Sequence, residues 1–406
     1  MSAGAWTFSL VNVIFLGAAG TAWAVAALTC RGRGQAPSWK AAAAAFAVLA
    51  LLTAVFDNLM ISAGLFDYDT SKRLGLVLYR APIEDFGYPL AAVVLLPALW
   101  HLLQGRTQRR AATGERATGS RLWQVVLASR PLSWVNTAFP FAAAYLFTTR
   151  EVDARLLVGT AFFLIPYNLL MYGVNDVFDY ESDRRNPRKG GAEGALLDKG
   201  LHRLTLVCAI VVPLPFVIWL VALGSLRAAL VLLVVLFAVV AYSAPRLRFK
   251  ERPVLDSATS STHFVGPALY GFVLAGAQLG PAHALILGAF FCWGMASQAF
   301  GAVQDVTADR AGGLASVATV FGAARTVRLA LTLWTLAAVL LLLTPWPGPV
   351  AAVLVVPYMA LAWPYRTVSD EHSEQANAGW RRFLGANYAV GAALTQLLIG
   401  LWQLNA

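Results

Sequence analysis

The chain has 406 residues, of which 58% are hydrophobic and 13% are charged, and its mean hydropathy is +0.63. A soluble domain carries about 25% charged residues, so this composition excludes a soluble protein and favours a polytopic membrane protein. The net charge of +10 does not indicate a nucleic-acid partner, because the basic residues cluster in short loops between apolar runs.

The apolar runs predict an all-α membrane protein of about twelve spans, arranged as a three-helix and a nine-helix module. The predicted domains are residues 1–105, a basic, Gly- and Thr-containing linker at 106–121, and residues 122–406. The expected spans are, in chain order, 6–29, 41–65, 84–104, 122–148, 156–180, 203–223, 226–243, 256–276, 283–304, 326–344, 348–365 and 381–403.

The charges between the spans predict how the chain is oriented. Basic residues follow the first, third, fifth, seventh and ninth spans, whereas the other connections are short and nearly uncharged apart from 66–81 and 149–155. By the positive-inside rule, the basic loops and the linker are cytoplasmic and both ends of the chain lie outside. We therefore expect a multi-pass protein of the cell membrane, in contact with membrane lipid.

Two sets of carboxylates stand at the ends of apolar spans. Asp176, Asp179 and Asp183 recur at i, i+3 and i+7 at the end of the fifth span, within roughly a 60° arc of one helix face. Asp305 and Asp309 form a second set at the end of the ninth span. Carboxylates are costly near lipid and repel one another, and a divalent cation removes both penalties. Two facing sets are the ligands that Mg²⁺ ions holding a diphosphate need, and both would lie on the cytoplasmic side.

The residues around these carboxylates are of types that bind phosphate oxygens. An amide side chain precedes each set, and basic side chains follow the first set and end the run that starts at Tyr242. Signalling of membrane orientation is the alternative explanation for the basic residues. The candidate metal-binding and catalytic residues are Asp176, Asp179, Asp183, Asp305 and Asp309. The candidate diphosphate-binding residues are Asn175, Arg184, Arg188, Lys189, Tyr242, Arg246, Arg248, Lys250 and Gln304.

Loss of diphosphate from an allylic carbon would leave a carbocation, which aromatic faces can stabilise in a dry site. Several aromatic residues lie within about three turns of the acidic sets on the same helices. They are Tyr167, Tyr172, Phe178, Trp293 and Phe300. Ordinary packing in membrane helices is the alternative role for each of them.

Three motifs resemble those of the intramembrane UbiA-type prenyltransferases. They are Asn-Asp-x-x-Asp-x-x-x-Asp from Asn175, Tyr-Ser-Ala-Pro-Arg-Leu-Arg-Phe-Lys from Tyr242, and Asp-x-x-x-Asp-Arg-x-x-Gly from Asp305. The resemblance covers about residues 120–406. It implies a nine-helix bundle that uses Mg²⁺ to ionise an isoprenoid diphosphate and transfers the prenyl group to a lipophilic acceptor. Ser316 stands where the family usually has Thr, which keeps a hydroxyl.

The stretches 171–194 and 297–305 are similar to the lycopene elongase branch of C50 carotenoid synthesis. This resemblance implies dimethylallyl diphosphate as donor and lycopene, with C45 and C50 carotenoids as products. The electron-rich terminal alkene of lycopene would attack the dimethylallyl cation. The new tertiary cation would then lose a proton or add water, and the sequence does not identify the base.

The first module carries Pro82-Ile83-Glu84-Asp85 at the start of its third span, and Asp57 deep in its second span. An ionisable residue inside a span is a functional hypothesis by default, although acids near a helix start are also favourable in themselves. The pattern resembles the small subunits of heterodimeric carotenoid cyclases, which carry Pro-x-Glu-Glu or Pro-x-Glu-Asp. The resemblance covers about residues 1–105. It implies acid catalysis by Glu84 first, then Asp85 and Asp57, together with a second cyclase subunit as partner.

The interpretation we prefer is a lycopene elongase preceded by one half of a C50 carotenoid cyclase. One alternative is a UbiA-type enzyme that acts on a quinone precursor, a tetrapyrrole or a lipid alcohol, with a non-catalytic N-terminal anchor. Another is a membrane transporter whose aspartates bind a coupling cation. A transporter site is expected near the midplane of the membrane, whereas these carboxylates stand at helix ends.

Overall fold

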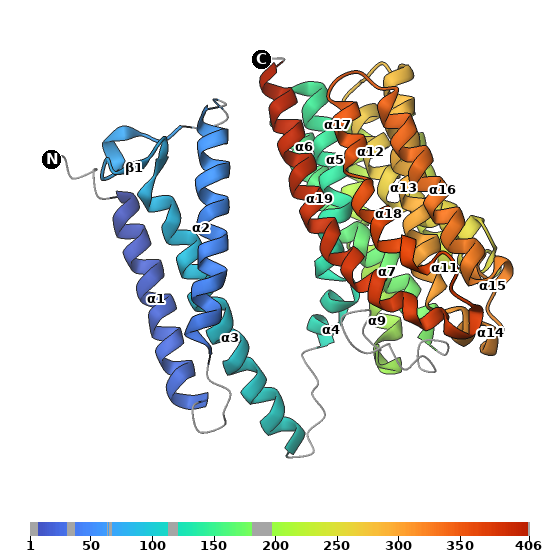
Figure 1. Ribbon diagram of the computed structural model, residues 1–406, viewed down its shortest axis with the longest axis horizontal. Helices are drawn as coiled ribbons and strands as arrows, with labels where there is room; N and C mark the ends of the chain where they lie inside the picture. The colour runs from blue at the N-terminus through green and yellow to red at the C-terminus, as the bar shows by residue number, and fades with distance from the viewer. Residues whose placement is uncertain are drawn as a thin grey trace. The chain divides into compact units, whose positions relative to one another are not determined.

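The computed structural model describes residues 7–30, 37–62, 64, 67–112, 121–180 and 197–404. The chain divides into two units: unit 1 comprises residues 1–118 with 402–406, and unit 2 comprises residues 119–401 (Figure 1). Each unit is built from helices, and within the described residues the strands are confined to one short hairpin.

Unit 1 has three long helices: α1 (Thr7–Cys30), α2 (Trp39–Ser62) and α3 (Gly87–Ala112). Helix α3 packs against both α1 and α2. The connection from α2 to α3 contains the 3-10 helix η3 (Thr70–Lys72), the antiparallel strands β1 (Val77–Leu78) and β2 (Ala81–Pro82), and the 3-10 helix η4 (Ile83–Phe86). Val77 pairs with Pro82 and Leu78 with Ala81, so this hairpin leads directly into η4.

Unit 2 is a bundle whose long helices run up and down between two ends (Figure 1). Its first half contains α4 (Arg121–Ala128), η5 (Pro131–Ser133), α5 (Trp134–Thr149), α6 (Ala154–Leu164), α7 (Pro166–Phe178), η6 (Lys199–Leu201), α9 (His202–Val211), α10 (Leu214–Leu223), α11 (Leu226–Ser243) and η7 (Phe249–Glu251). Its second half contains α12 (Leu255–Leu274), α13 (Pro281–Val303), α14 (Val306–Ala311), α15 (Val317–Phe321), α16 (Ala323–Leu342), α17 (Gly348–Val353), α18 (Val356–Ala362), η8 (Trp363–Tyr365), η9 (Asp370–Gln375) and α19 (Ala376–Leu404).

Prolines and one glycine account for where the bundle's helices break. Pro166 begins α7 directly after α6, and Pro213 separates α9 from α10, because proline lacks the N–H that would continue the helix. Gly322, with φ of +81°, separates α15 from α16 and adopts a conformation that other residues rarely reach. When broken helices are taken together, the described residues of unit 2 form nine helical passes.

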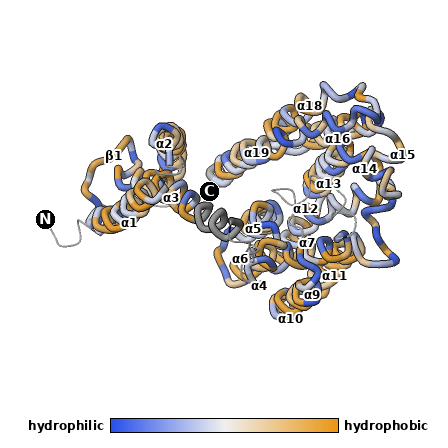
Figure 2. The backbone as a smooth tube through the Cα atoms, turned by 90° about the horizontal axis from the view of Figure 1, so that it is seen from below, coloured by the Kyte–Doolittle hydropathy of each residue, from blue (hydrophilic) through white to orange (hydrophobic). Residues whose placement is uncertain are grey.

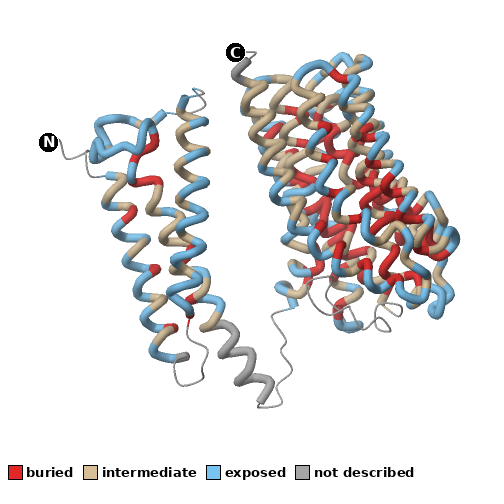
Figure 3. The backbone as a smooth tube through the Cα atoms, in the orientation of Figure 1, coloured by how far each residue is buried: buried red, intermediate tan, exposed pale blue. Residues whose placement is uncertain are grey.

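The described core of unit 2 has two large hydrophobic clusters and a small third one of Ala128, Leu197 and Leu201. One of the large clusters lies among α5, α6, α7, α9, α10 and α11, and the other lies among α13, α15, α16, α18 and α19. Helix α12 packs against α5, α11 and α13 and so joins the two halves. Buried residues are concentrated inside this bundle, whereas α2 of unit 1 has none (Figure 3).

Ten helical segments of the described chain are long and apolar enough to cross a membrane. Hydrophobic residues make up much of these helices (Figure 2), and many of the large ones are exposed, as a lipid-facing surface requires. The protein is therefore an all-α polytopic membrane protein, which confirms the fold class expected from the sequence.

Three segments differ from the expected spans, and each difference has a physical reason. Span 122–148 is divided between α4 and the 16-residue α5, because Pro131 interrupts it. Span 256–276 forms α12, but its first half is rich in Ser and Thr, which lowers its hydropathy. Helix α3 continues to Ala112, into the expected linker, because that segment consists largely of helix-forming Arg, Gln and Ala.

Candidate functional site

The first carboxylate set lies where α7 ends. Asp176 is in the last turn of α7 and Asp179 directly follows the helix, so the two lie together at one helix end. Asp183 lies outside the described residues, as do Arg184, Arg188 and Lys189. Asp176 is 3% exposed and Asp179 is 8% exposed. Buried carboxylates need cationic or hydrogen-bonding partners, and both have them.

Arg130 is the partner of Asp176. Its Nη2 atom donates to Asp176 Oδ1 at 3.0 Å, and its guanidinium lies 4.3 Å from the ring centroid of Tyr172, one turn earlier on α7. Arg130 has φ of +51° and is followed by Pro131, so it stands at the corner between α4 and η5. Arg130 could not be predicted as a site residue from the sequence, because it lies 46 residues from Asp176 and belongs to no charge cluster.

Lys250 and Arg248 face Asp179 from the loop after α11. Lys250 forms an ion pair with Asp179, and Arg248 Nη2 lies 3.8 Å from Asp179 Oδ1. Burial lowers the pKa of Lys250 to about 8. Glu251 pairs with Arg248, which raises the pKa of Arg248. The structure thus brings two of the predicted basic residues onto one predicted carboxylate.

Asn175 links α7 to α11. Its Oδ1 atom accepts a hydrogen bond from Ser243 Oγ at 2.8 Å and another from Lys250 Nζ at 3.5 Å. Arg246, in contrast, is exposed, and its backbone carbonyl accepts a hydrogen bond from Arg252 at 3.4 Å. The Tyr242 run therefore supplies one end of α11, a turn with left-handed residues at Arg246 and Arg248, and the partly buried Lys250.

The second carboxylate set lies at a helix junction. Helix α13 ends at Val303, and Asp305 is the N-cap residue of the short helix α14, which contains Asp309. The amide of Gln304 accepts a hydrogen bond from Asn377 at the start of α19. As expected, an amide residue, Gln304, precedes this acidic set. The two carboxylates, however, belong to α14 and not to α13.

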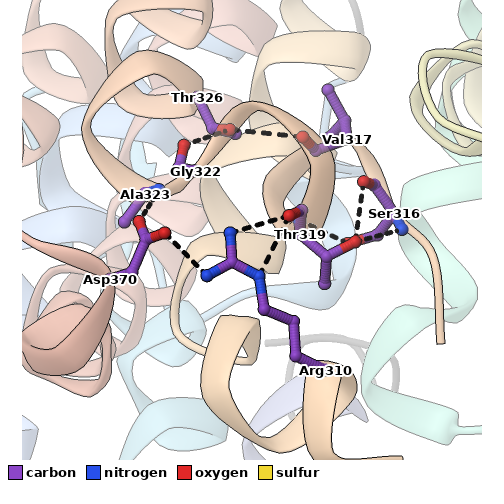
Figure 4. Close-up of polar contacts among 8 residues, drawn as sticks. All are labelled: Arg310, Ser316, Val317, Thr319, Gly322, Ala323, Thr326 and Asp370. Atoms are coloured by element: carbon purple, nitrogen blue, oxygen red, sulfur yellow. Dashed lines mark hydrogen bonds and ion pairs between the residues drawn. The ribbon is translucent and has the colours of Figure 1, made fainter. Parts of the chain in front are cut away.

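A clamp around Arg310 fixes the loop after the second set. Arg310 Nε and Nη2 donate to Thr319 O at 3.0 and 2.7 Å, and Arg310 Nη1 donates to Asp370 Oδ2 at 2.7 Å (Figure 4). Asp370 Oδ1 also accepts from the backbone N–H of Ala323, the first residue of α16, at 2.6 Å. Ser316 caps α15 through Thr319. Arg310, the residue after Asp309, is thus held by α15 and η9, and Asp370 of η9 is in turn bonded to the start of α16.

Asp256, near the start of α12, connects the basic loop after α11 to the segment that Arg310 holds. It is 1% exposed, and its Oδ2 atom accepts from the backbone N–H of Val317 at 2.8 Å while Oδ1 accepts from the N–H of Ser257. Its position near the start of an expected span was the sequence signal that could have identified it, because an ionisable residue there requires partners.

Polar side chains continue into the bundle from the carboxylate end. Gln298 on α13 accepts from Ser260 Oγ at 3.0 Å and lies 3.5 Å from the hydroxyl of Tyr242. Tyr242 packs edge-on against His263, and the Tyr167 hydroxyl donates to the carbonyl of His263 at 3.2 Å. The remaining expected aromatic residues on α13, Trp293 and Phe300, pack in the second hydrophobic cluster.

The ends of α7, α11 and α13 and the starts of α9, α12 and α16 meet at one end of the bundle (Figure 1). Within the described residues, no group of three or more His, Cys, Asp or Glu side chains is arranged to hold a metal ion. The described donors are carboxylate and amide oxygens, which are the hard ligands of Mg²⁺, a cation that keeps water and substrate phosphates as further ligands. These donors fit a site in which the protein, water and substrate phosphates together bind Mg²⁺, and not one in which the protein supplies every ligand.

Unit 1 buries the two acids of the Pro82 motif. Glu84 is 7% exposed and Asp85 is 5% exposed. Glu84 Oε1 accepts from the backbone N–H of Leu74 at 2.6 Å, and its carbonyl accepts from Asn12 Nδ2 on α1 at 2.7 Å. Glu84 therefore ties η4 to α1 and to the segment before β1.

Asp85 forms side-chain hydrogen bonds with Asp57 on α2 and with Tyr68. The neighbouring Asn58 accepts from the backbone N–H groups of Arg80 and Ala81 at 2.7 and 3.0 Å, which fixes the hairpin on α2. The three acids expected from the sequence thus lie in one region of unit 1, and Tyr68 joins them without any signal in the sequence that predicts it.

The UbiA prenyltransferase family model matches residues 137–387, which is more than half of the chain. The chain belongs to this family. A UbiA homologue from Archaeoglobus fulgidus, solved with DMAPP and Mg²⁺, has a TM-score of 0.51 and 20% identity and covers 66% of this chain and 98% of its own. That likeness shows the shared fold of the bundle.

Two curated relatives are more similar in sequence. The C(50) beta-cyclic carotenoids biosynthesis protein LbtBC of Dietzia sp. (strain CQ4) is 47% identical over 388 residues, covering 88% of this chain and 89% of its own. The lycopene elongase/hydratase of Corynebacterium glutamicum is 50% identical over 280 residues, covering 69% of this chain and 98% of its own. The Dietzia match covers more than unit 2 alone supplies, so it extends into unit 1.

Proposed function

We propose that unit 2 transfers dimethylallyl groups from dimethylallyl diphosphate to the two ends of lycopene, giving C45 and C50 carotenoids. The observation that supports this proposal most strongly is the cluster at the end of α7, in which Asp176 pairs with Arg130 and Asp179 pairs with Lys250. The names of the Corynebacterium and Dietzia relatives support a lycopene-type acceptor.

Asp176, Asp179 and Asp183 would hold one Mg²⁺, and Asp305 and Asp309 would hold another. Bound there, the cations would offset the negative charge that builds up on the departing diphosphate. The two ion pairs of the first set keep its carboxylates charged inside the protein. When substrate binds, Arg130 and Lys250 are placed to exchange these carboxylates for phosphate oxygens.

The protein's own side chains then have three tasks. Arg130, Arg248 and Lys250 bind the diphosphate and stabilise it as a leaving group. The apolar side chains of the first hydrophobic cluster, against which Tyr172 packs, exclude water, so that the allylic carbon meets the terminal alkene of lycopene. A carbon–carbon bond forms there as the carbon–oxygen bond to diphosphate breaks. The tertiary cation that results is discharged by loss of a proton or addition of water.

Unit 1 contributes, in this proposal, one half of a C50 carotenoid cyclase and needs a second cyclase subunit. Two observations support it: the extension of the Dietzia match into unit 1, and the burial of Glu84 and Asp85. Protonation of a terminal alkene needs a carboxylic acid in an apolar site, because such a site favours the uncharged form. Expression of Asp85→Asn with a partner subunit would preserve elongation and abolish ring formation.

We further propose that the protein lies in the cell membrane with the diphosphate site on the cytoplasmic side. The basic loops that follow α7, α11 and α13 support this orientation. Diphosphate substrates are made in the cytoplasm, so they would reach the carboxylates from that side.

The experiment uses a lycopene-producing bacterial host that expresses the chain. Wild-type protein should convert lycopene to C45 and C50 carotenoids, as read by mass spectrometry, and Asp176→Asn should leave lycopene unchanged. Glu371→Gln, at an exposed position outside the carboxylate sets, is the matched control and should behave as the wild type. Unchanged lycopene with well-expressed wild-type protein would refute the elongase assignment and favour another lipophilic acceptor.

A further inference from the structure

Asp57 and Asp85 stand in a relation that two ionised carboxylates cannot adopt. Their side chains hydrogen-bond to each other, from α2 and η4 respectively. An ionised carboxylate accepts hydrogen bonds but cannot donate one. One proton between the two groups is therefore required, and two carboxylates that share a site hold such a proton because both cannot be charged at close range.

Among the described groups that act most strongly on this pair, none is a cation that would replace this proton. The groups that act most strongly on Asp85 are Tyr68, Asp57 and Glu84, and Tyr88 acts in turn on Tyr68. None of these groups is basic. Burial, and then the hydrogen bond with Asp85, raises the pKa of Tyr68, so that its hydroxyl remains a donor.

Buried oxygens in the same region also outnumber the donors. Asn12 Oδ1, Glu84 Oε2 and Asp85 Oδ2 are shielded from solvent, and within the described part of the chain they meet no hydrogen-bond donor. Asp85 and Glu84 are each more than nine-tenths buried. Such a set of acceptors is costly unless a protonated group completes it.

We infer that Asp57 and Asp85 share one proton at neutral pH and form the acid of unit 1, that Tyr68 donates to Asp85, and that Glu84 is a positioning residue. The order expected from the sequence, with Glu84 first, is thereby changed. Glu84 Oε1 is held by the N–H of Leu74, and this bond favours a fixed, acceptor role for that carboxyl.

The chemistry of this acid rests on the proposed cyclase function. The pair gives its proton to a carbon of the terminal alkene, and the neighbouring double bond closes the ring by attacking the resulting cation. The ring cation then loses one proton, which the pair takes back. No electrons are gained or lost, so the step is an isomerisation of a polyene and needs no co-reactant.

The test is infrared spectroscopy of the full chain in liposomes at neutral pH, in H₂O and in D₂O. The carbonyl stretch of a protonated carboxylic acid is resolved from the amide band and shifts in D₂O. We expect Asp57→Asn and Asp85→Asn each to remove one such band that the wild type shows, because the remaining carboxyl then ionises. Glu84→Gln should keep that band, and Tyr68→Phe should shift it without removing it.

Control measurements distinguish loss of the shared proton from misfolding of the variant and from failure of the proposed cyclase function. Dimethylallyl transfer by unit 2, together with circular dichroism, reports whether each variant folds. The inference is overturned if the wild type lacks the band, if both Asp variants keep it, or if Glu84→Gln alone removes it. A band that behaves as expected, in a protein that forms no rings with any partner subunit, would leave the shared proton standing and refute the cyclase function instead.

Discussion

Arg130→Ala removes the guanidinium that pairs with a carboxylate whose side chain is 2% exposed, while that of Arg130 is 25% exposed. Removing one partner of a buried ion pair costs about 3–5 kcal/mol of folding stability. Because Arg130 is partly exposed, we expect a loss of about 3 kcal/mol. Loss of its contact with the Tyr172 ring adds to this by about 0.5–1 kcal/mol. The variant should therefore melt at a lower temperature than the wild type in detergent.

Activity should fall as well, because Arg130 is proposed to bind the diphosphate. Removal of one such charge-stabilising donor costs about 10²–10³ in turnover. Arg130→Lys should keep the charge but lose the planar contact with Tyr172, so its activity should be intermediate.

The double variant Arg130→Ala/Asp176→Asn distinguishes the two effects. It should recover much of the lost stability, because no charged carboxylate is left without its partner, and it should remain inactive. Thermal unfolding followed by tryptophan fluorescence, and pigment analysis in the lycopene-producing host, provide the two readouts. Wild-type stability and turnover in Arg130→Ala would refute the role of this pair.

Three further results are expected. Asp256→Asn should lower the melting temperature and turnover together, because it weakens the link to Val317; a loss of turnover with unchanged melting would contradict this. Asp370→Ala should unfold more easily than Asp370→Asn by about 1 kcal/mol, because only the asparagine retains an acceptor that can cap Ala323; equal denaturant midpoints would be inconsistent with the clamp. Chelation of divalent cations should stop prenyl transfer in membranes, and added Mg²⁺ should restore it; transfer that persists in excess chelator would argue against a metal-assisted reaction.

The sequence predicted the parts of the fold that depend on composition and on local pattern. Long apolar runs gave the all-α membrane architecture, and the motifs from Asn175, Tyr242 and Asp305 indicated the family that the comparisons confirmed. Prolines that divide spans, such as Pro166 and Pro213, were present in the sequence, but whether a helix bends or ends at proline depends on its packing partners.

The contacts across the site could not be predicted, because their partners are distant in the chain. Arg130 meets Asp176 across 46 residues, Asp256 meets Val317 across 61, and Arg310 meets Asp370 across 60. None of these pairs forms a spacing pattern, since they come together only when separate helices end at the same level. The assignments of Asp183, Arg184, Arg188 and Lys189 stay predictions, because those residues lie outside the described part of the chain.

The most direct measurement is prenyl transfer by purified protein in liposomes that contain lycopene, supplied with isotope-labelled dimethylallyl diphosphate and Mg²⁺. The account predicts one labelled unit in a C45 product and two in a C50 product. It also predicts that Asp176→Asn and Asp305→Asn abolish both products while Glu371→Gln leaves them unchanged. Labelled C50 carotenoid formed at the wild-type rate by the two aspartate variants would contradict the account.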